Sequence, residues 1–113
     1  MTITLRRTSP KGSQYYYTIH DRQAGLFQAY TLITVWGPKP ENGREKIYGF
    51  DSRREKDAAL RKMIAKRIRD GYTVFYSYSR SGRYRKVFQE FKQNEGVSAQ
   101  LEGSRKSLRT RSG

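Results

Sequence analysis

Apolar and polar side chains alternate along most of the N-terminal half of the chain, a pattern that indicates strands with one buried face. Ile3 and Leu5 share a face in the first such segment, and Tyr17 and Ile19 share a face in the second. Turn residues such as Gly12 separate the segments. The predicted strands are Thr2–Arg7, Gln14–His20, Leu26–Trp36, Lys46–Phe50 and Thr73–Tyr78.

Two of these strands carry expectations about particular side chains. The odd-numbered positions of Leu26–Trp36 are the more apolar ones, so Trp36 should leave the strand on its less apolar face. Strict alternation in Thr73–Tyr78 would separate Phe75 from the valine and tyrosines on either side of it. The Asn42-Gly43 pair predicts a turn after Trp36 because both residues tolerate positive φ. The strands on either side of this turn should therefore form a hairpin.

The period of the pattern changes from two to three or four after Phe50. Ser52 and Glu55 have the spacing of a capping box at a helix start, and Gly71 supplies a C-terminal stop. A main helix is therefore predicted over about Ser52–Asp70, and a short C-terminal helix over Tyr84–Gln93. The apolar stripe of the main helix is formed by Ala59, Leu60, Met63, Ile64 and Ile68. One side of the short helix would carry Tyr84, Val87, Phe88 and Phe91.

These elements predict an α+β fold, in which a small twisted antiparallel sheet of four or five strands has the main helix packed on one face. We expect residues 1–94 to form a single domain. From Glu95 onward the chain is rich in Ser, Gly, Arg and Lys and has few apolar residues, so it cannot repay the entropy of ordering. Residues 95–113 are therefore predicted to be a disordered basic tail.

Composition narrows the chemistry that this domain can perform. The chain has 113 residues and no cysteine, which excludes disulfides, thiolate metal sites and cysteine nucleophiles. Its single histidine, His20, excludes histidine-rich metal sites. Asp51 and Glu55 suit helix capping better than acid–base catalysis, and no phosphate-binding glycine motif occurs. We therefore expect a binding module without a metal or cofactor, and not an enzyme.

Charge is the strongest compositional signal. The chain has 24 Lys and Arg against 10 Asp and Glu, a formal net charge of +14, and the excess is spread over the whole length. Such a surface repels itself unless an anionic partner is bound, and nucleic acid is the default partner. Since no apolar run is long enough to span a bilayer, and arginines replace the apolar stretch of a signal peptide, we expect a cytoplasmic monomer with no membrane partner.

An ordered set of residues between Leu5 and Tyr78 resembles the WGR domain, a module named for a Trp-Gly-Arg signature and found in poly(ADP-ribose) polymerases and bacterial proteins. The matching residues are Trp36, Gly37, Gly43, Phe50, Ser52, Ala58, Lys66 or Arg67, Gly71 and Tyr72. The resemblance implies DNA binding through the phosphate backbone with a preference for strand ends or nicks, and nucleoid association if the protein is bacterial. The extension after about residue 78 is this chain's own.

One signature position departs from the family, because Pro38 stands in place of the Arg. In WGR domains that Arg contacts the DNA backbone beside the Trp, whereas proline has neither charge nor donor. We predict that neighbouring Lys39 or Arg44 returns a cation to the site. The candidate nucleic-acid-binding residues are Trp36, Lys39, Arg44, Lys46, Arg53, Arg54, Lys62, Arg83, Arg85 and Lys86.

Several of these residues have a structural interpretation as well as a functional one. Trp36 is either a core aromatic that anchors the hairpin or a ring that stacks at a strand end. The helix cations are either a solvated face or phosphate ligands. Arg53 and Arg54 keep both interpretations open, because cations in a first helical turn oppose the macrodipole unless an anion is bound there.

The nature of the partner also has alternatives. The stretch from Tyr76 to Lys86 interleaves tyrosines with cations, which suits single-stranded nucleic acid or RNA. WGR domains in the polymerases also transmit a signal to a catalytic domain. A free-standing copy would, on that interpretation, be an interaction module for a separate protein partner.

The predicted tail gives the first test. Deleting Gly96–Gly113 should weaken binding to all nucleic-acid sequences alike, because the tail would bind phosphates and not bases. The slope of log affinity against log salt should fall by about 0.9 for each phosphate that the tail neutralises in the intact protein. Affinities at several salt concentrations would measure this slope. An unchanged slope would show that the tail binds no phosphates.

Overall fold

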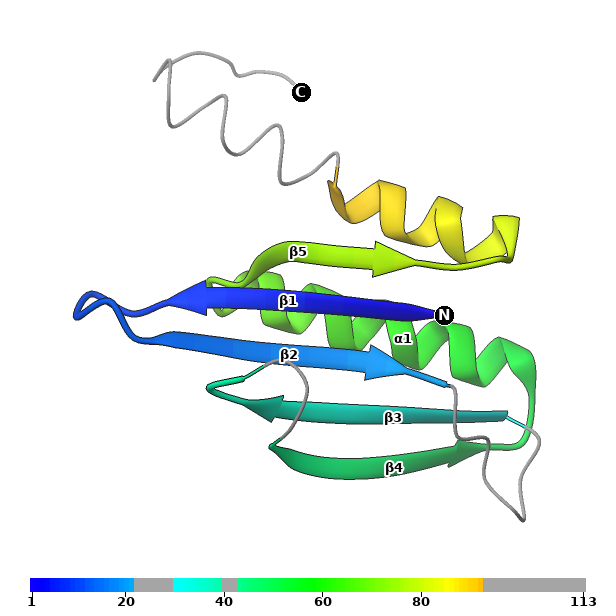
Figure 1. The fold of residues 1–113 in the computed structure, drawn as a ribbon. Coiled ribbons are helices and arrows are strands. Elements are labelled where there is room, and N and C mark those ends of the chain that lie inside the picture. The colour runs from blue at the N-terminus through cyan, green and yellow to red at the C-terminus, as the bar shows by residue number, and fades with distance from the viewer. Residues whose placement is uncertain (22–29, 40–42, 93–113) are drawn as a thin grey trace.

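The computed structural model describes residues 1–21, 30–39 and 43–92 (Figure 1). The start of the predicted strand Leu26–Trp36, the turn residue Asn42 and the tail from Glu95 lie outside the described residues. The described elements are β1 (Thr2–Thr8), β2 (Gln14–His20), β3 (Tyr30–Gly37), β4 (Arg44–Phe50), α1 (Arg53–Arg69), β5 (Thr73–Tyr78) and a C-terminal helix over residues 82–92.

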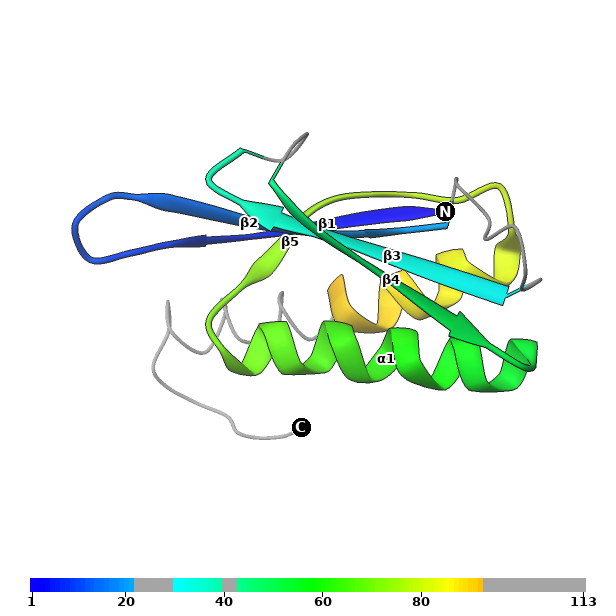
Figure 2. The ribbon, with the colours of Figure 1, turned by 90° about the horizontal axis from the view of Figure 1, so that it is seen from below.

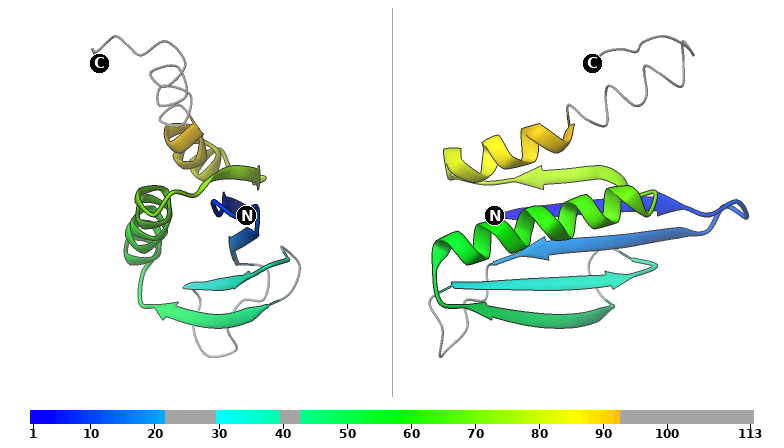
Figure 3. Two further views of the ribbon diagram at one scale, coloured as in Figure 1. Left: turned by 90° about the vertical axis from the view of Figure 1, so that its left-hand side faces the viewer. Right: turned by 180° about the vertical axis from the view of Figure 1, so that it is seen from behind.

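The five strands form one sheet in the order β4-β3-β2-β1-β5, and every neighbouring pair is antiparallel. Helix α1 crosses one face of this sheet, and the C-terminal helix lies on the same side next to β5 (Figures 2 and 3). We call this face the helix-side face. The opposite face, which we call the open face, carries no helix in the described part of the chain. The predicted α+β class, with two helices, is confirmed.

The core fills the space between the helix-side face and the two helices. Ile3, Leu5 and Ile19 point into it from the central strands and are fully buried. Leu60 and Ile64 reach them from α1, as the predicted apolar stripe requires. The C-terminal helix adds Val87 and Phe88, which are 2% and 3% exposed.

Trp36 leaves β3 on the less apolar face, as expected. Leu32 is fully buried in the core, and Trp36 packs against the same core, so these even-numbered positions occupy the helix-side face. The helices therefore cover the less apolar face of β3, and Ile33 on the opposite face is buried as well, at 1% exposed. An apolar count does not score this face as core, because the residues that follow Leu32 on it are the fully buried Thr34 and the half-buried Trp36.

The alternation expected in β5 is wrong, because the ladder contains an extra residue. Val74 pairs with Leu5 and packs on the core, but Tyr76 pairs with the next residue of β1, Thr4, so Phe75 is an extra residue in the ladder. Such a bulge lets consecutive side chains share a face. Phe75 and Tyr76 are consequently both turned to the open face, where they are 49% and 54% exposed.

Helix α1 begins as predicted. Ser52 is its N-cap and accepts a hydrogen bond from the Glu55 backbone N–H at 3.2 Å. The Glu55 carboxylate accepts from the backbone N–H of Asp51 at 3.2 Å, one residue earlier than in a standard capping box. The backbone N–H groups of Asp51 and Glu55 therefore both have acceptors, and α1 begins directly after β4.

A charged residue extends the buried stripe of α1. Lys56 is only 8% exposed, and its ammonium donates to the Asp21 carboxylate at 2.9 Å. The amino group of Met1 donates to the other oxygen of the same carboxylate at 2.8 Å. Burial would raise the pKa of Asp21, but these two cations hold the pKa below its ordinary value.

Polar contacts tie the C-terminal helix to α1 beside its apolar ones. The Tyr84 hydroxyl donates to Asp57 at 3.0 Å. Burial and this carboxylate raise the pKa of Tyr84 to about 12. Tyr84 therefore stays neutral and keeps donating throughout the physiological range.

Replacing Asp21→Asn should lower the free energy of unfolding by about 1–2 kcal/mol at neutral pH, because Lys56 loses a charged partner in a largely buried place. The pKa of Asp21 is depressed in the folded state, so its contribution is present above the unfolded pKa and disappears as pH falls through the folded one. Urea unfolding of both proteins should therefore converge in acid. Glu90→Gln, which removes an exposed ion pair with Arg61, is the control and should change stability little.

Candidate nucleic-acid interface

The candidate site is a hollow of about 370 Å³ on the helix-side face, which we call the Trp36 hollow. It opens where the end of β3 meets the last turn of α1. Trp36 is half-buried there, since one part of its ring packs on the core and another lines the hollow. The lining residues are Tyr17, Trp36, Lys46, Tyr48, Arg67 and Tyr72.

The β3–β4 hairpin supplies three of these side chains through its register. Trp36 pairs with Arg44, and the pairs that follow place Lys46 and Tyr48 on β4 at alternate positions. Paired residues of antiparallel strands point to the same face, so Arg44, Lys46 and Tyr48 all share the helix-side face with Trp36. The Lys46 ammonium lies 5.0 Å from the centre of the Tyr48 ring.

Gly43 fixes the position of Trp36 from the turn. Its φ is +154°, and a Cβ at this position would overlap the backbone carbonyl of Trp36. The glycine therefore allows the chain to pass directly against the strand that carries the indole. This close approach is a physical reason for a glycine seven residues after the tryptophan.

The end of α1 supplies the other wall of the hollow. Gly71 adopts φ +96° and, with Tyr72, closes the helix by donating to the carbonyls of Ile68 and Arg67 at 3.0 and 2.9 Å. This is the Schellman arrangement, which reverses the chain direction. It returns the Tyr72 ring to within 6.5 Å of the Tyr17 ring.

Arg67 lies among these aromatic rings. Its guanidinium is 4.6 Å from the centre of the Tyr17 ring and 6.0 Å from that of Tyr72. Its Nε is buried and has no hydrogen-bond acceptor among the described residues. The nearest carboxylate oxygen with which it forms an ion pair belongs to Asp70, at 3.8 Å.

The hollow is aromatic and cationic in chemistry. Its lining includes two cations and no carboxylate. Burial raises the pKa of Tyr17, an effect that the neighbouring Arg67 opposes without cancelling it. Tyr17 therefore remains a neutral phenol, and the net charge of the lining stays positive. Such a lining suits a group with a flat or ring-shaped face attached to an anion.

A second group of predicted residues lies at the opposite end of α1. Arg53, Arg54 and Arg83 line a hollow of about 510 Å³ together with Arg61. Asp57 lies among them and accepts from Arg83 at 3.2 Å, and Glu90 pairs with Arg61 at 3.4 Å, so two of the four cations are partly neutralised. Arg53 and Arg67 are fourteen residues apart on the helix, which places the two groups roughly 21 Å apart.

The remaining predicted residues are distributed more widely. Lys39 is exposed two residues beyond β3, and Lys62 is exposed on α1. Arg85 donates to the carbonyls of Ser79 and Arg80 at 3.0 and 3.1 Å, so it also holds the turn that precedes the C-terminal helix. Arg85 and Lys86 line a third hollow, beside β5.

The residues predicted from sequence cover only part of the Trp36 hollow. They include Trp36 and Lys46 but omit Arg67 and the tyrosines Tyr17, Tyr48 and Tyr72. The sequence pattern groups Arg67 with the outer helix cations, yet this residue is half-buried. Its position three residues after Ile64, on the stripe side of the helix, is the signal that could have found it.

The chain matches a known protein family over most of its length. The model of the WGR domain family matches residues 1–80, so the chain belongs to this family. WGR domains are generally nucleic-acid-binding modules of proteins related to the poly(ADP-ribose) polymerases. No curated protein and no solved structure matches the chain.

No helix within residues 1–21, 30–39 and 43–92 is long and apolar enough to cross a membrane. Within the same ranges, no cluster of three or more His, Asp or Glu side chains is arranged to hold a metal ion.

The role of Gly43 can be tested directly. In Gly43→Ala, the added methyl group would displace the backbone carbonyl of Trp36. The substitution should therefore lower the free energy of unfolding by about 1–3 kcal/mol. It should also shift the fluorescence emission of Trp36, the only tryptophan of the chain. Gly12→Ala is a matched control, since Gly12 also has positive φ but open space around the added Cβ. The control should leave Trp36 emission unchanged. Equal emission from both variants would contradict the close approach.

Proposed function

We propose that this protein is a DNA-binding module that holds the phosphate backbone of a duplex and seats a strand terminus, at an end or a nick, in the Trp36 hollow. The observation that carries this proposal is the meeting of Trp36, Lys46 and Arg67 in one hollow without a lining carboxylate. An indole offers a stacking surface to a terminal sugar or base. The two cations offer charge to the adjoining phosphate.

Lys46 and Arg67 could supply the positive charge that the signature arginine, replaced here by Pro38, provides in the family. Arg44 shares the face of Trp36, and Lys39 is close to it in sequence, but neither lines the hollow. Arg67 retains the planar guanidinium that suits phosphate, whereas Lys46 provides a flexible point charge. We therefore assign the role of the missing arginine first to Arg67 and Lys46, with Lys39 and Arg44 as flanking cations.

The outer side of α1 supports backbone binding beyond the hollow. Five of the six exposed cations of α1 fall within an arc of about 140° around the helix axis and along roughly 22 Å of its length. They are Arg54, Arg61, Lys62, Lys66 and Arg69. This arrangement favours contacts with several phosphates of one duplex without reading its bases. We propose that the module binds without catalysis of its own.

A competition assay tests the proposal with nicked duplex, blunt duplex, covalently closed circular DNA, single-stranded DNA and duplex RNA at two salt concentrations. The intact protein should prefer nicked and blunt duplexes over closed circles. Trp36→Ala should remove about 1–3 kcal/mol from this preference while leaving general binding intact. Trp36→Phe keeps an aromatic ring and should retain part of the preference.

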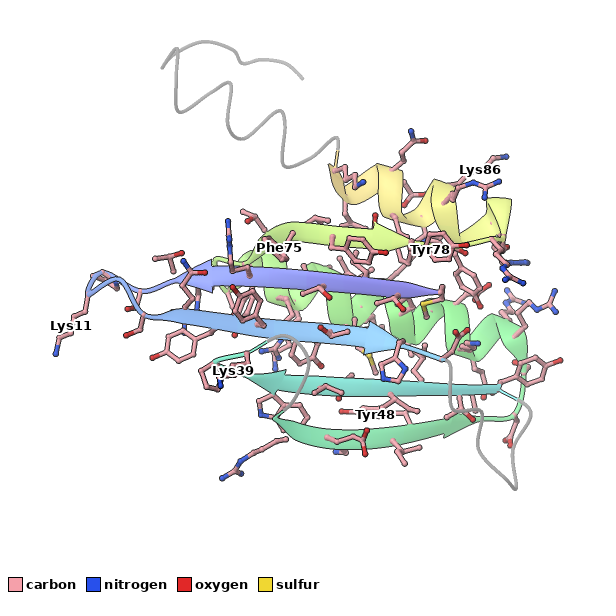
Figure 4. All side chains as sticks on the ribbon, in the orientation of Figure 1. Lys11, Lys39, Tyr48, Phe75, Tyr78 and Lys86 are labelled. Carbon is pink, nitrogen blue, oxygen red and sulfur yellow. The ribbon has the colours of Figure 1, made fainter. Side chains whose placement is uncertain are left out.

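The charge assignments have their own comparison in the same assay. Arg67→Gln and Lys46→Gln should each weaken end binding more than Lys11→Gln, which removes the same charge from the β1–β2 turn (Figure 4). Lys39→Ala with Arg44→Ala tests the flanking cations. Equal and steeply salt-dependent binding to every polyanion, unaffected by Trp36→Ala, would show that Trp36 serves only the core.

A further inference from the structure

The open face carries a row of exposed aromatic side chains that the Trp36 hollow does not use. Phe75, Tyr76 and Tyr78 on β5 are 49%, 54% and 55% exposed. We call these three residues the β5 aromatic row. Figure 4 shows Phe75 and Tyr78 along β5, with Lys86 on the adjoining C-terminal helix. Trp36 lies on the other face of the sheet, so the row is a separate surface.

The bulge at Phe75 creates this row. In a regular strand, Phe75 and Tyr76 would point to opposite faces of the sheet. Instead, the Phe75 ring also lies on the open face, 4.5 Å beneath the Arg6 guanidinium and 5.7 Å from the Tyr16 ring. Tyr76 and Tyr78 pair with Thr4 and Thr2, whose side chains face this side too. Three aromatic side chains of one short strand are thereby presented together.

Cations border the row at the outer edge of the sheet. Tyr78 also lines a hollow of about 610 Å³ between β5 and the C-terminal helix. Arg85, Lys86 and Lys92 line the same hollow, and no carboxylate does. The acidic residue that β4 contributes to the open face, Glu45, is four strands away from β5, or roughly 19 Å.

We infer that the β5 aromatic row and its bordering cations bind unpaired nucleotides of single-stranded nucleic acid. Bases would stack on the rings, and phosphates would lie toward Arg85, Lys86 and Lys92. This site goes beyond the proposed duplex-end function and does not depend on Trp36.

The spacing of the rings favours unpaired over paired bases. Two residues that share a face of a strand, such as Tyr76 and Tyr78, are about 6.8 Å apart. Stacked bases in duplex DNA are only about 3.4 Å apart, and their faces are already covered by one another. Adjacent bases can each meet a ring only after they have unstacked, which a single strand permits.

The charge of the surface favours nucleic acid over a second copy of this chain. Pairing of two β5 edges would bring the Arg85, Lys86 and Lys92 groups of both copies together, and like charges repel. A polyanion with aromatic faces meets both the cations and the rings.

The test uses the full chain, a labelled short oligothymidylate and fluorescence anisotropy, with the matching oligouridylate as a second probe for the sugar. Phe75→Ala with Tyr78→Ala should weaken binding of both probes by at least about tenfold. Phe75→Leu with Tyr78→Leu keeps apolar side chains without rings and should also lose affinity. Ile47→Ala is the matched control, since Ile47 is 61% exposed on the open face at the opposite sheet edge.

Nicked duplex distinguishes this inference from the proposed function. The double variant should bind nicked duplex as the intact protein does, whereas Trp36→Ala should bind oligothymidylate normally. Photocrosslinking of an iodouridine oligonucleotide should mark Tyr76 or Tyr78. Unchanged oligonucleotide binding by the double variant, or equal loss on nicked duplex, would overturn the inference. If the double variant lost a self-associated species seen for the intact protein in sedimentation but still bound the oligonucleotide, the row would be assigned to contacts between copies of the chain instead.

Discussion

The packing of one helix, α1, onto the sheet is the constraint on which the rest of this molecule depends. Its apolar contribution is small, because Leu60 and Ile64 are the fully buried residues of the helix. A cationic side chain lies at each end of the interface between α1 and the sheet. The Lys56 ammonium donates to Asp21, and the Arg67 guanidinium lies over the Tyr17 ring. Long cationic side chains that bury their stems in this way cover apolar surface while keeping their charge. The helix is thus able to be strongly basic and still pack.

This arrangement also determines where binding surfaces form. Near the C-terminal end of α1, aromatic side chains fill much of the space between the helix and the sheet. They are those of Trp36, Tyr48 and Tyr72. Large rings pack less completely than branched aliphatic groups, so a hollow remains beside them. The hollow and the outer cations of α1 are therefore both consequences of a single, strongly basic helix covering a wide sheet.

The strands, the helix boundaries, the capping of α1 by Ser52 and the hairpin can all be predicted from the sequence, because each has a local signal. Prediction fails where tertiary context decides the outcome. Apolar alternation places Trp36 on the less apolar face of β3 but does not show that α1 covers that face. Charge alone does not show which side of a helix is buried, so Arg67 resembles a solvated cation. The bulge at Phe75 has no local signature, since it arises from the pairing of β5 with β1.

The bulge has a further consequence for the behaviour of the protein at high concentration. β5 is an edge strand, and an exposed edge with aromatic side chains is the usual starting point for sheet-to-sheet aggregation. An extra residue in the ladder bends such a strand and spoils the register that an incoming strand would need. The same distortion that turns Phe75 outward therefore hinders the pairing of β5 with a strand of another molecule.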